Sequence, residues 1–529
     1  MAVPSIMAEN PRIALVTFYD AVSLGVRSLH AVLTQAGYPT DLIFFRDHLN
    51  SERPLPSEAE YRLLLQTLEE RQPRLVGLSL RSFGFKIAAR ITKEVKERLA
   101  ALVVWGGVHP TLAPEDCAAV ADAVCVGEGE GAMLELAEAL RDGRDFSGIR
   151  NLWSRQGDQI IRNPLRPLQQ DLDALPFPVL GDEGKFLIED DQLLRCDPYL
   201  GPPNTGEYYL SASRGCPYRC DYCCNSAFHR IYQGAGPYVR KRSPEHVLLE
   251  LERAKRELKL HYVGFMDEVF SLDKSWTLAI CQGYRDRIGL PFKCEVHPQT
   301  LDEELVAGMK AAGLTYAVVG VQSGSERTRR ELYHRMMSNA EILEAARLLH
   351  HYQVIPYFDF ILDNPYETAQ DLAESLDLVC RLPRPYNLEI LSLTFFPSTE
   401  ITRRALADET ISPDQVEGQA QKTLTSLWYS LPRAYNPLHA LHAVLFALSL
   451  VKLDWKIPQL GYVTSRFQTS RHLLPTGLLR FFSRRELFRR KPGLLYLPVK
   501  YSVTVGDRLL SPLRRLRKIH GRLRSPKQR

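Results

Sequence analysis

Four of the ten cysteines of the 529-residue chain fall within nine consecutive residues, 216–224. The first three, Cys216, Cys220 and Cys223, follow a Cys-x3-Cys-x2-Cys spacing. Thiolates are soft ligands, and such a group on one short loop indicates zinc or an iron–sulfur centre rather than disulfide bonds. Three thiolates can hold three irons of a [4Fe–4S] cube and leave the fourth iron open. Structural zinc prefers four ligands in two separated pairs, and no second Cys-x2-Cys or His-x3-His pair follows. An iron–sulfur cluster is therefore preferred, with zinc as the alternative.

Predicted strands alternate with predicted helices on both sides of this loop. The strands fall at residues 208–213, 262–266, 292–296, 316–321, 355–362 and 388–395. Ser243-Pro244-Glu245 is typical of a helix start, with serine as the cap and proline at the first helical position. Six strands with helices between them suit a partial (βα)6 barrel. The cysteine loop follows the first strand, at the end of a barrel where chemistry is usually found.

The amino-terminal third also alternates strands and helices, but its strands are nearly continuous apolar runs. Five are predicted, at residues 12–18, 41–45, 75–80, 102–105 and 123–126. Such strands indicate a parallel, doubly wound sheet, whose ligands lie beyond the carboxyl ends of the strands. Three loops at these ends contain glycine, at 20–25, 106–111 and 127–130. Glycine lets the backbone approach a ligand closely, although a structural turn explains each loop equally well.

Length and composition indicate an ordinary globular chain of two or three domains, with 45% hydrophobic and 24% charged residues. We assign a doubly wound domain to residues 1–143, a connector with a small hairpin to 144–206, the barrel to 207–408, and a mostly helical, basic region to 409–529. The amino terminus lacks an export signal pattern. The longest apolar run, 438–450, is too short to span a bilayer. We therefore expect a cytoplasmic protein.

The basic residues concentrate near the carboxyl terminus. Residues 466–529 contain 18 Lys/Arg and 2 Asp/Glu, a net charge of +16, so the rest of the chain carries a net charge of −11. Segments 478–490 and 509–519 interleave cationic with bulky apolar residues. That pattern predicts a peripheral contact with the anionic inner face of a membrane. Nucleic acid is a less favoured partner, and a solvated tail is an equal alternative.

The cysteine loop, with Arg214-Gly215 before it and an aromatic residue before its third cysteine, resembles the cluster loop of the radical S-adenosylmethionine (SAM) superfamily. The resemblance implies that Cys216, Cys220 and Cys223 ligate a [4Fe–4S] cluster whose open iron chelates SAM. It further implies SAM contacts from residues at the ends of the second and fourth strands, which are Asp267, Glu268, Gln322 and Ser323. Gln322 stands where the family often has a carboxylate. Cys224 is expected to be a buried core thiol, with a substitute cluster ligand or a redox group as the alternatives.

The glycine loops of the amino-terminal third resemble the cobalamin-binding domain that precedes many radical SAM enzymes. The resemblance implies cobalamin contacts from the strand ends and their loops, namely Ser79, Gly106, Gly107, Val108, His109, Gly127, Glu128 and Gly129. Some cobalamin proteins coordinate cobalt from below through the histidine of Asp-x-His-x-x-Gly. Here Asp20 and Gly25 match that motif, but Val22 occupies the histidine position. Any bound cobalamin would therefore lack that lower ligand. A flavodoxin-like domain without a ligand is the alternative.

Together these resemblances, which cover roughly residues 10–405, imply a cobalamin-dependent radical SAM enzyme with a [4Fe–4S] cluster, SAM and cobalamin as cofactors. In the family's chemistry, reductive cleavage of SAM gives a 5′-deoxyadenosyl radical that removes a hydrogen atom from an unactivated carbon. We expect methylation of a lipid-like or natural-product small molecule, with an electron donor such as a flavodoxin or ferredoxin. Radical cyclisation or carbon–carbon coupling is the first alternative. A non-enzymatic cobalamin or redox sensor is the second.

Overall fold

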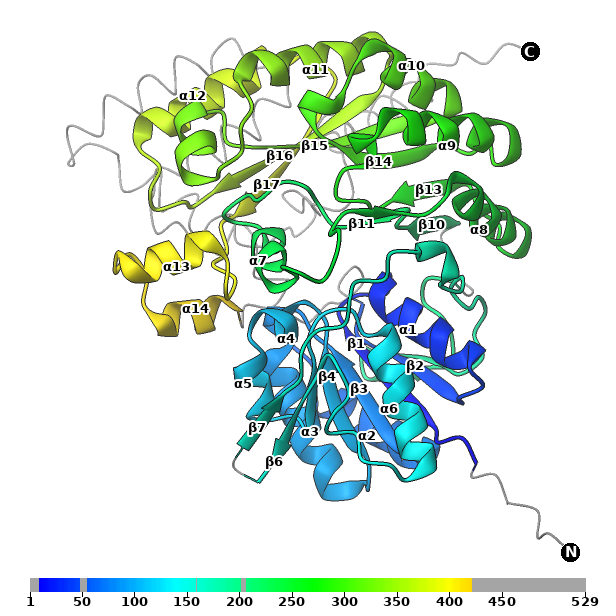
Figure 1. Cartoon of the computed structure of the whole chain (residues 1–529). Helices are drawn as coiled ribbons and strands as arrows, with labels where there is room; N and C mark the ends of the chain where they lie inside the picture. The colour runs from blue at the N-terminus through cyan, green and yellow to red at the C-terminus, as the bar shows by residue number, and fades with distance from the viewer. Residues whose placement is uncertain (1–8, 48–54, 158, 201–205, 421–529) are drawn as a thin grey trace, which may run out of the picture.

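The computed structural model describes residues 9–47, 55–157, 159–200 and 206–420. Two α/β units lie one above the other, with helix α7 (Cys224–Ile231) between them (Figure 1). The amino-terminal unit is the lower one in this view, and the barrel is the upper one. Helices α13 (Glu400–Ala407) and α14 (Pro413–Ala420) follow the barrel and end the described part of the chain.

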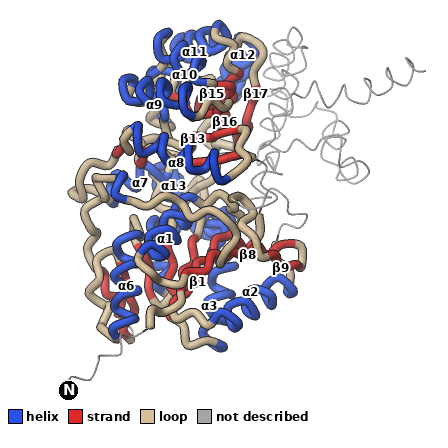
Figure 2. Tube along the Cα trace, turned by 90° about the vertical axis from the view of Figure 1, so that its right-hand side faces the viewer, coloured by secondary structure: helices blue, strands red, loops and turns tan. Residues whose placement is uncertain are grey.

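The amino-terminal unit is built on the five predicted parallel strands. They are β1 (Ile13–Phe18), β2 (Thr40–Phe45), β3 (Leu75–Ser79), β4 (Leu102–Gly106) and β5 (Ala123–Cys125), in the spatial order β5-β4-β3-β1-β2. Their side chains are almost all buried, because helices cover both faces of the sheet. Figure 2 shows α1 (Leu24–Gln35) and α6 (Glu130–Asp142) on one face and α2 (Glu58–Arg71) and α3 (Phe85–Arg98) on the other. This arrangement confirms the doubly wound fold predicted from the apolar runs.

Short helical segments complete this unit after β3 and β4. They are η1 (Ser82–Gly84), α4 (Val108–Leu112) and α5 (Pro114–Ala118). Because η1 follows β3 and α4 follows β4, these two segments border the edge of the sheet where ligands of this fold bind.

Much of the predicted connector belongs to the first sheet. The hairpin expected at 149–161 is present as β6 (Leu152–Gln156) and β7 (Gln159–Arg162), which pair antiparallel beside β5. On the opposite edge, β8 (Lys185–Glu189) pairs parallel with β2 and antiparallel with β9 (Gln192–Leu194). In the part of the chain that the structure describes, this sheet therefore has nine strands, and the stretch around η2 (Leu172–Ala174) joins β7 to β8.

A buried ion-pair network fixes the loop after β1. Arg27 of α1 donates to Asp197 at 2.7 Å and 2.8 Å, and Lys185 of β8 donates to the same carboxylate at 2.8 Å. Arg27 also donates to the carbonyl oxygens of Ala21 and Val22. Burial alone would raise the pKa of Asp197, but Arg27 and Lys185 hold it well below its usual range. The loop is therefore held by a carboxylate that stays ionised.

The second unit is a six-stranded, fully parallel sheet in the sequence order predicted for a partial (βα)6 barrel. Its strands are β10 (Glu207–Leu210), β13 (Tyr262–Phe265), β14 (Phe292–Val296), β15 (Leu314–Gln322), β16 (Ile355–Leu362) and β17 (Asn387–Ser392). Its helices are α8 (Pro244–Glu257), α9 (Lys274–Arg287), α10 (Glu303–Ala312), α11 (Asn339–His351) and α12 (Ala369–Arg381). Shorter segments are η3 (Phe270–Leu272), η4 (Pro298–Thr300) and the π-helical η5 (Thr328–Leu332).

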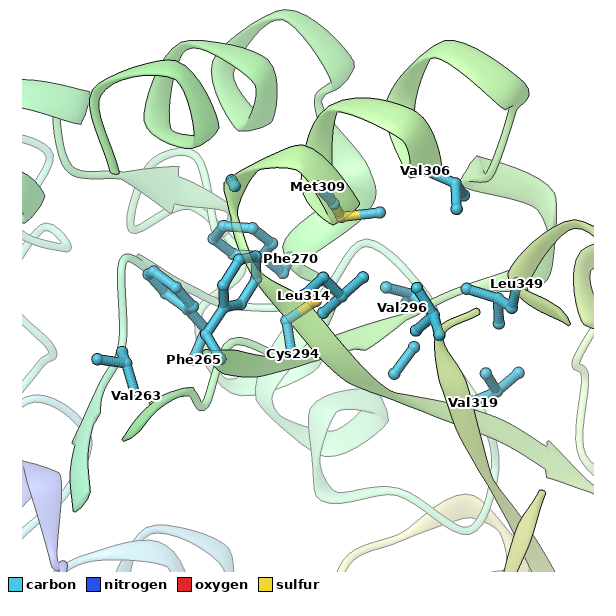
Figure 3. Close-up of a cluster of buried hydrophobic side chains, with 14 of the residues drawn as sticks. Val263, Phe265, Phe270, Cys294, Val296, Val306, Met309, Leu314, Val319 and Leu349 are labelled. Atoms are coloured by element: carbon cyan, nitrogen blue, oxygen red, sulfur yellow. The ribbon is translucent and has the colours of Figure 1, made fainter. Parts of the chain in front are cut away.

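The barrel core lies between the sheet and its outer helices. Figure 3 shows its apolar side chains, including Phe265 and Val296 from strands and Met309 and Leu349 from helices. On β14, Phe292, Cys294 and Val296 are buried in this core, whereas Lys293 and Glu295 are half-buried on the other face. Alternate residues of a strand point to opposite faces. The face turned away from the helices therefore carries the polar side chains of the barrel.

The predicted helix start at Ser243 is confirmed. The Ser243 side chain accepts a hydrogen bond from the backbone N–H of His246, and Pro244 takes the first helical position of α8. The basic segments of residues 466–529 lie outside the described residues. Within the described ranges, no helix has the length and apolarity needed to cross a membrane.

Replacing Asp197 by alanine is expected to destabilise the protein strongly, because Arg27 and Lys185 would remain buried without a counter-charge. Breaking a buried pair in this way costs about 3–5 kcal/mol. Thermal unfolding followed by circular dichroism should show a lower transition midpoint. Asp286→Ala serves as the control, because Asp286 is 59% exposed in its pair with Arg285, and should leave the midpoint nearly unchanged. Equal midpoints for wild type and Asp197→Ala would contradict this assignment.

Candidate active site

The cysteine loop leaves the barrel through a two-stranded ribbon, β11 (Ser213–Arg214) paired with β12 (Arg240–Lys241). Gly215 follows β11 with φ +88°, and a Cβ at this position would collide with the carbonyl oxygen of Tyr238. Glycine is therefore required directly before Cys216. The loop is anchored at Asp221, whose N–H donates to the Tyr333 carbonyl oxygen at 3.1 Å. These contacts fix the loop at the carboxyl end of the first barrel strand, as predicted.

The three predicted cluster ligands lie together in this loop. Cys216 and Cys220 are buried and Cys223 is half-buried. Burial is the main reason that the pKa of the Cys216 thiol rises to about 12, and Glu268, Cys223 and Cys220 add to the shift. A bound metal would favour the thiolate form instead. The thiols are therefore close enough to influence one another electrostatically, as ligands of one centre must be.

Two polar side chains stand against these sulfur atoms. The Arg335 guanidinium lies 3.6 Å from Sγ of Cys220, and Nδ2 of Asn225 lies 3.6 Å from Sγ of Cys223. Arg335 also donates to the Gly320 carbonyl oxygen at 2.7 Å. Hydrogen bonds to sulfur help to orient and tune an iron–sulfur centre. Arg335 was missed by the sequence analysis, because it lies 115 residues from Cys220 and outside every motif.

Cys224 differs from the expected buried core thiol. It is half-buried at the first position of α7, and Cys223 is the residue that caps this helix. A hydrogen bond from Cys224 is the largest contribution that lowers the pKa of Cys223. Cys224 therefore supports the thiolate of its neighbour. The difference arises because the helix starts at Cys224 and keeps its side chain beside the loop.

Within the described ranges, no three His, Cys, Asp or Glu side chains converge closely enough to hold a single metal ion. A cube-shaped cluster binds each of its thiolates through a different iron. The loop therefore does not need that convergence to fit the predicted cluster.

Two of the four predicted SAM contacts, Asp267 and Ser323, are engaged in hydrogen bonds within the protein. Asp267 accepts from the Ala212 N–H at 3.2 Å and from the Ser213 hydroxyl, and burial raises its pKa to about 6. The Ser323 hydroxyl donates to Glu367 at 2.8 Å. These two side chains hold the strand ends in place.

Glu268 and Gln322 keep polar atoms available for a ligand. Glu268 is accessible to solvent, although the surrounding protein raises its pKa above the usual value. Gln322 is only 9% exposed, and its Oε1 is buried without a hydrogen-bond partner. A buried orphan acceptor is unfavourable unless a ligand supplies a donor. With the Arg335 cation nearby, these residues would hold the amino, hydroxyl and carboxylate groups of SAM.

A cavity of about 380 Å³ lies between the two units, on the carboxyl ends of the first sheet. Six of the predicted cobalamin contacts line it, namely Ser79, Gly106, Gly107, Gly127, Glu128 and Gly129. Val108 and His109 are not among the lining residues: Val108 is exposed, and His109 is buried against the ring of Phe85. Burial lowers the pKa of His109 to about 4. No sequence feature distinguishes Val108 and His109 from the neighbouring residues that line the cavity.

The glycines of the cavity fit a large, flat ligand. Gly107 has φ +99°, and a Cβ there would lie 2.9 Å from the Leu80 carbonyl oxygen. An added Cβ at Gly25 would meet no protein atom within 4 Å, so it would occupy open space. Apolar side chains from the sheet and from α1 and α6 complete this side of the cavity, among them Leu15, Leu29 and Met133. The residues present therefore fit cobalamin.

Among the described residues, the position of the motif histidine is Val22, and His246 is the histidine that lines the cavity. Val22 packs against the hydrophobic core of the barrel and does not line the cavity. His246 of α8 does line it, but Nδ1 of His246 accepts a hydrogen bond from Nε of Arg242 at 2.9 Å. Burial and Arg242 also lower the pKa of His246. The same Nδ1 also lies 3.3 Å from Oδ1 of Asp173, so the imidazole is held by side chains of the protein.

Two segments of the chain match known families. Residues 210–379 match the Radical SAM superfamily, and residues 12–137 match the B12 binding domain. An uncharacterized methyltransferase of Pyrococcus horikoshii is 25% identical over 398 residues, which are 72% of this chain and 81% of that protein. The anaerobic magnesium-protoporphyrin IX monomethyl ester cyclase of Cereibacter sphaeroides is 25% identical over 370 residues, which are 66% of this chain and 55% of the cyclase.

Solved structures share the arrangement of the two units. TsrM, a radical S-adenosylmethionine methyltransferase from Kitasatospora setae, has a TM-score of 0.58 at 18% identity, over 75% of this chain and 76% of TsrM. OxsB, a cobalamin-dependent S-adenosylmethionine radical enzyme, has a TM-score of 0.60 at 16% identity, over 96% of this chain and 75% of OxsB.

The protein is therefore an enzyme of the radical SAM superfamily with an amino-terminal cobalamin-binding domain. The two matched families are those of SAM and cobalamin chemistry, and related structures were solved with cobalamin and a [4Fe–4S] cluster in TsrM and with aqua-cobalamin and SAM in OxsB. These matches support an enzyme and not the non-enzymatic sensor considered from the sequence.

Replacing Cys216, Cys220 and Cys223 together by alanine should abolish cluster binding, because no thiolate would remain to hold the irons. Anaerobically reconstituted wild type should contain about four irons at this site, and the triple variant should contain none. Cys224→Ala is the matched control on the same loop and should keep its iron. Full iron content in the triple variant, or complete loss in Cys224→Ala, would show that the ligands are assigned wrongly.

Bound cobalamin should lack a nitrogen ligand from the protein beneath cobalt. The electron paramagnetic resonance spectrum of the cob(II)alamin form should show no superhyperfine splitting from an axial nitrogen. His246→Ala should leave the spectrum unchanged, because Arg242 and Asp173 hold the imidazole of His246. Nitrogen splitting in the wild type that disappears in His246→Ala would overturn this prediction.

Proposed function

We propose that this enzyme transfers a methyl group to an unactivated carbon of a small molecule, a natural product or a lipid-like compound. The proposal rests on one observation: the cobalamin cavity and the segment that leads into the cluster loop share a wall. Glu128 and Glu130 line the cobalamin cavity, and both contact Arg214, two residues before the first cluster cysteine. A reaction that needs radical generation and a methyl carrier requires such adjacency. When bound, the reduced cluster and SAM supply the radical, and cobalamin supplies the methyl group.

The residues of the chain position the reacting groups. Glu268, Gln322 and Arg335 offer the carboxylate, acceptor and cation that would hold SAM on the cluster side. Holding reactants in a near-attack geometry removes much of the entropic cost of the reaction. The apolar cavity wall around Leu15, Leu29 and Met133 keeps water from the cobalamin side.

The polar face of the barrel indicates what a substrate would meet. Asp359 of β16 is the register partner of Gly320 and of Glu389 on the neighbouring strands. Burial and then Glu268 raise the pKa of Glu295 to about 8. Burial and then Glu389 raise the pKa of Asp359 well above its usual value. Protonated carboxyl groups can donate hydrogen bonds, so this face supports a substrate with polar groups, such as a natural product, over a plain hydrocarbon chain.

Radical cyclisation is the second candidate, because relatives from three organisms are magnesium-protoporphyrin IX monomethyl ester cyclases. It would use the same cofactors and the same cavity. The two candidates differ in whether the product gains a carbon.

The proposal is tested by incubating reduced holoenzyme with methyl-labelled SAM and small-molecule extracts of the source organism. Methylation predicts 5′-deoxyadenosine and an extract compound that gains the label in comparable amounts. The triple cysteine variant is the control and should yield neither. Formation of 5′-deoxyadenosine together with an unlabelled, modified compound would replace methylation by cyclisation. Absence of 5′-deoxyadenosine from a cluster-loaded enzyme would contradict both candidates.

A further inference from the structure

Two arginines of the β11–β12 ribbon stand opposite each other. Arg214 and Arg240 are register partners in this antiparallel pair. Like charges directly opposite each other destabilise a ribbon. Here the Glu128 carboxylate lies between them, 3.1 Å from Nη1 of Arg214 and 2.9 Å from Nη1 of Arg240. The ribbon is therefore stabilised by a carboxylate from the other domain.

Arg214 reaches a second carboxylate on the same loop of the cobalamin domain. Its Nη2 lies 2.6 Å from Oε1 of Glu130, which also accepts a hydrogen bond from the Ser28 hydroxyl at 2.8 Å. Glu130 starts α6, where the helix dipole favours negative charge. One guanidinium thus bridges two carboxylates with two different nitrogens, which a lysine ammonium could not do in the same planar geometry.

These charges are shielded from solvent. The exposed fractions of the side chains are 27% for Arg214, 20% for Glu128, 14% for Glu130 and 4% for Arg240. Ion pairs with limited exposure are stronger and less screened than surface pairs. Two cations and two anions balance, so the group needs no further counter-charge. We call these four residues the interface clamp.

The interface clamp joins the two cofactor sites. On one side, Glu128, Glu130 and Arg214 line the cobalamin cavity. On the other side, Arg214 is followed by Gly215 and then by Cys216, the first cluster ligand. The end of α7 lies against the same loop, because a Cβ on Gly127 would sit 2.9 Å from the Tyr232 hydroxyl. The segments before and after the cysteines are therefore both held against the cobalamin loop.

We propose that the interface clamp sets the distance and orientation between the [4Fe–4S] cluster and cobalamin, with Arg214 and Glu130 as its decisive positioning residues. Reactions between bound groups are sensitive to small displacements, and a misplacement of about 1 Å can cost about a hundredfold in rate. The clamp would hold the cluster loop, and with it the SAM bound there, at one separation from the methyl carrier. This role requires both cofactors but does not depend on which carbon accepts the methyl group.

The test measures the separation of the cofactors directly, without a substrate. Holoenzyme loaded with cluster and hydroxocobalamin is reduced to give two paramagnetic centres, the reduced cluster and cob(II)alamin. The fast-relaxing cluster speeds the spin relaxation of cob(II)alamin through dipolar coupling, and this enhancement of the relaxation rate falls with the sixth power of distance. This enhancement is measured for wild type, Arg214→Gln, Arg214→Lys, Glu130→Gln and a control variant.

The control is Arg287→Gln. Arg287 also bridges two glutamates, Glu245 and Glu252, and its side chain is also 27% exposed, but its partners lie on α8, an outer helix of the barrel. Substituting it removes a similar double ion pair away from the cavity. Iron and cobalt contents are measured for every variant, so that relaxation is compared only between fully loaded proteins.

The clamp predicts a relaxation enhancement about two-fold or more weaker in Arg214→Gln and Glu130→Gln, because the cofactors separate or their distances spread. Arg214→Lys should lie between these variants and wild type, and Arg287→Gln should match wild type. An unchanged enhancement in fully loaded Arg214→Gln and Glu130→Gln would overturn the proposal. Loss of cobalamin at full iron content in both variants would also overturn it, because the residues would then be binding residues. If Arg214→Gln does not fold, the near-isosteric Glu130→Gln decides.

Discussion

The ion pairs of Arg214 with Glu128 and Glu130 hold together two units that each contain only part of the active site. The amino-terminal sheet supplies a glycine-lined cavity, and the barrel supplies the cysteine loop and its polar face. Neither unit alone brings a methyl carrier and a radical source together. Two further contacts limit the path of the cluster loop, since Gly215 lies against the Tyr238 carbonyl oxygen before Cys216 and Tyr232, directly after α7, packs against Gly127. Shielding from solvent makes these pairs strong enough to define one arrangement.

Buried charged groups also fix the positions of loops and strand ends in both units. The Arg27–Asp197–Lys185 network fixes the loop after β1 and keeps Val22 against the barrel core. That placement explains why residue 22, which stands where some cobalamin proteins have a cobalt-binding histidine, does not face the cobalamin cavity. In the barrel, Asp267 and Ser323 are occupied by hydrogen bonds that hold strand ends, whereas Gln322 keeps an orphan acceptor. The predicted SAM contacts thus divide into residues that support the site and residues that remain available to a ligand.

Local patterns predicted the fold well. Apolar runs located the strands of both sheets within a few residues, and 292–296 and 355–362 coincide with β14 and β16, because burial imposes the pattern directly. The cysteine spacing located the cluster loop for the same local reason. The sequence did not reveal that β6 to β9 join the first sheet, since β6, β7 and β9 carry exposed residues and the apolar run of β8 is only three residues long. It also could not reveal Arg335, Glu130 or the second role of Arg214, because these contacts join residues far apart in the chain. Val108 and His109 share a loop with Gly107 but do not line the cavity, and only tertiary packing separates them.

The central claim is that one protein molecule holds the cluster and cobalamin on either side of the Arg214–Glu128–Glu130 contact. Anomalous diffraction from anaerobic holoenzyme crystals, recorded at the iron and cobalt absorption edges, tests this claim most directly. The expected result is an iron peak beside Cys216, Cys220 and Cys223. A cobalt peak is expected in the cavity next to Gly106 and Gly107, on the opposite side of that contact. A zinc signal at the cysteines, or a cobalt peak away from this cavity, would contradict it.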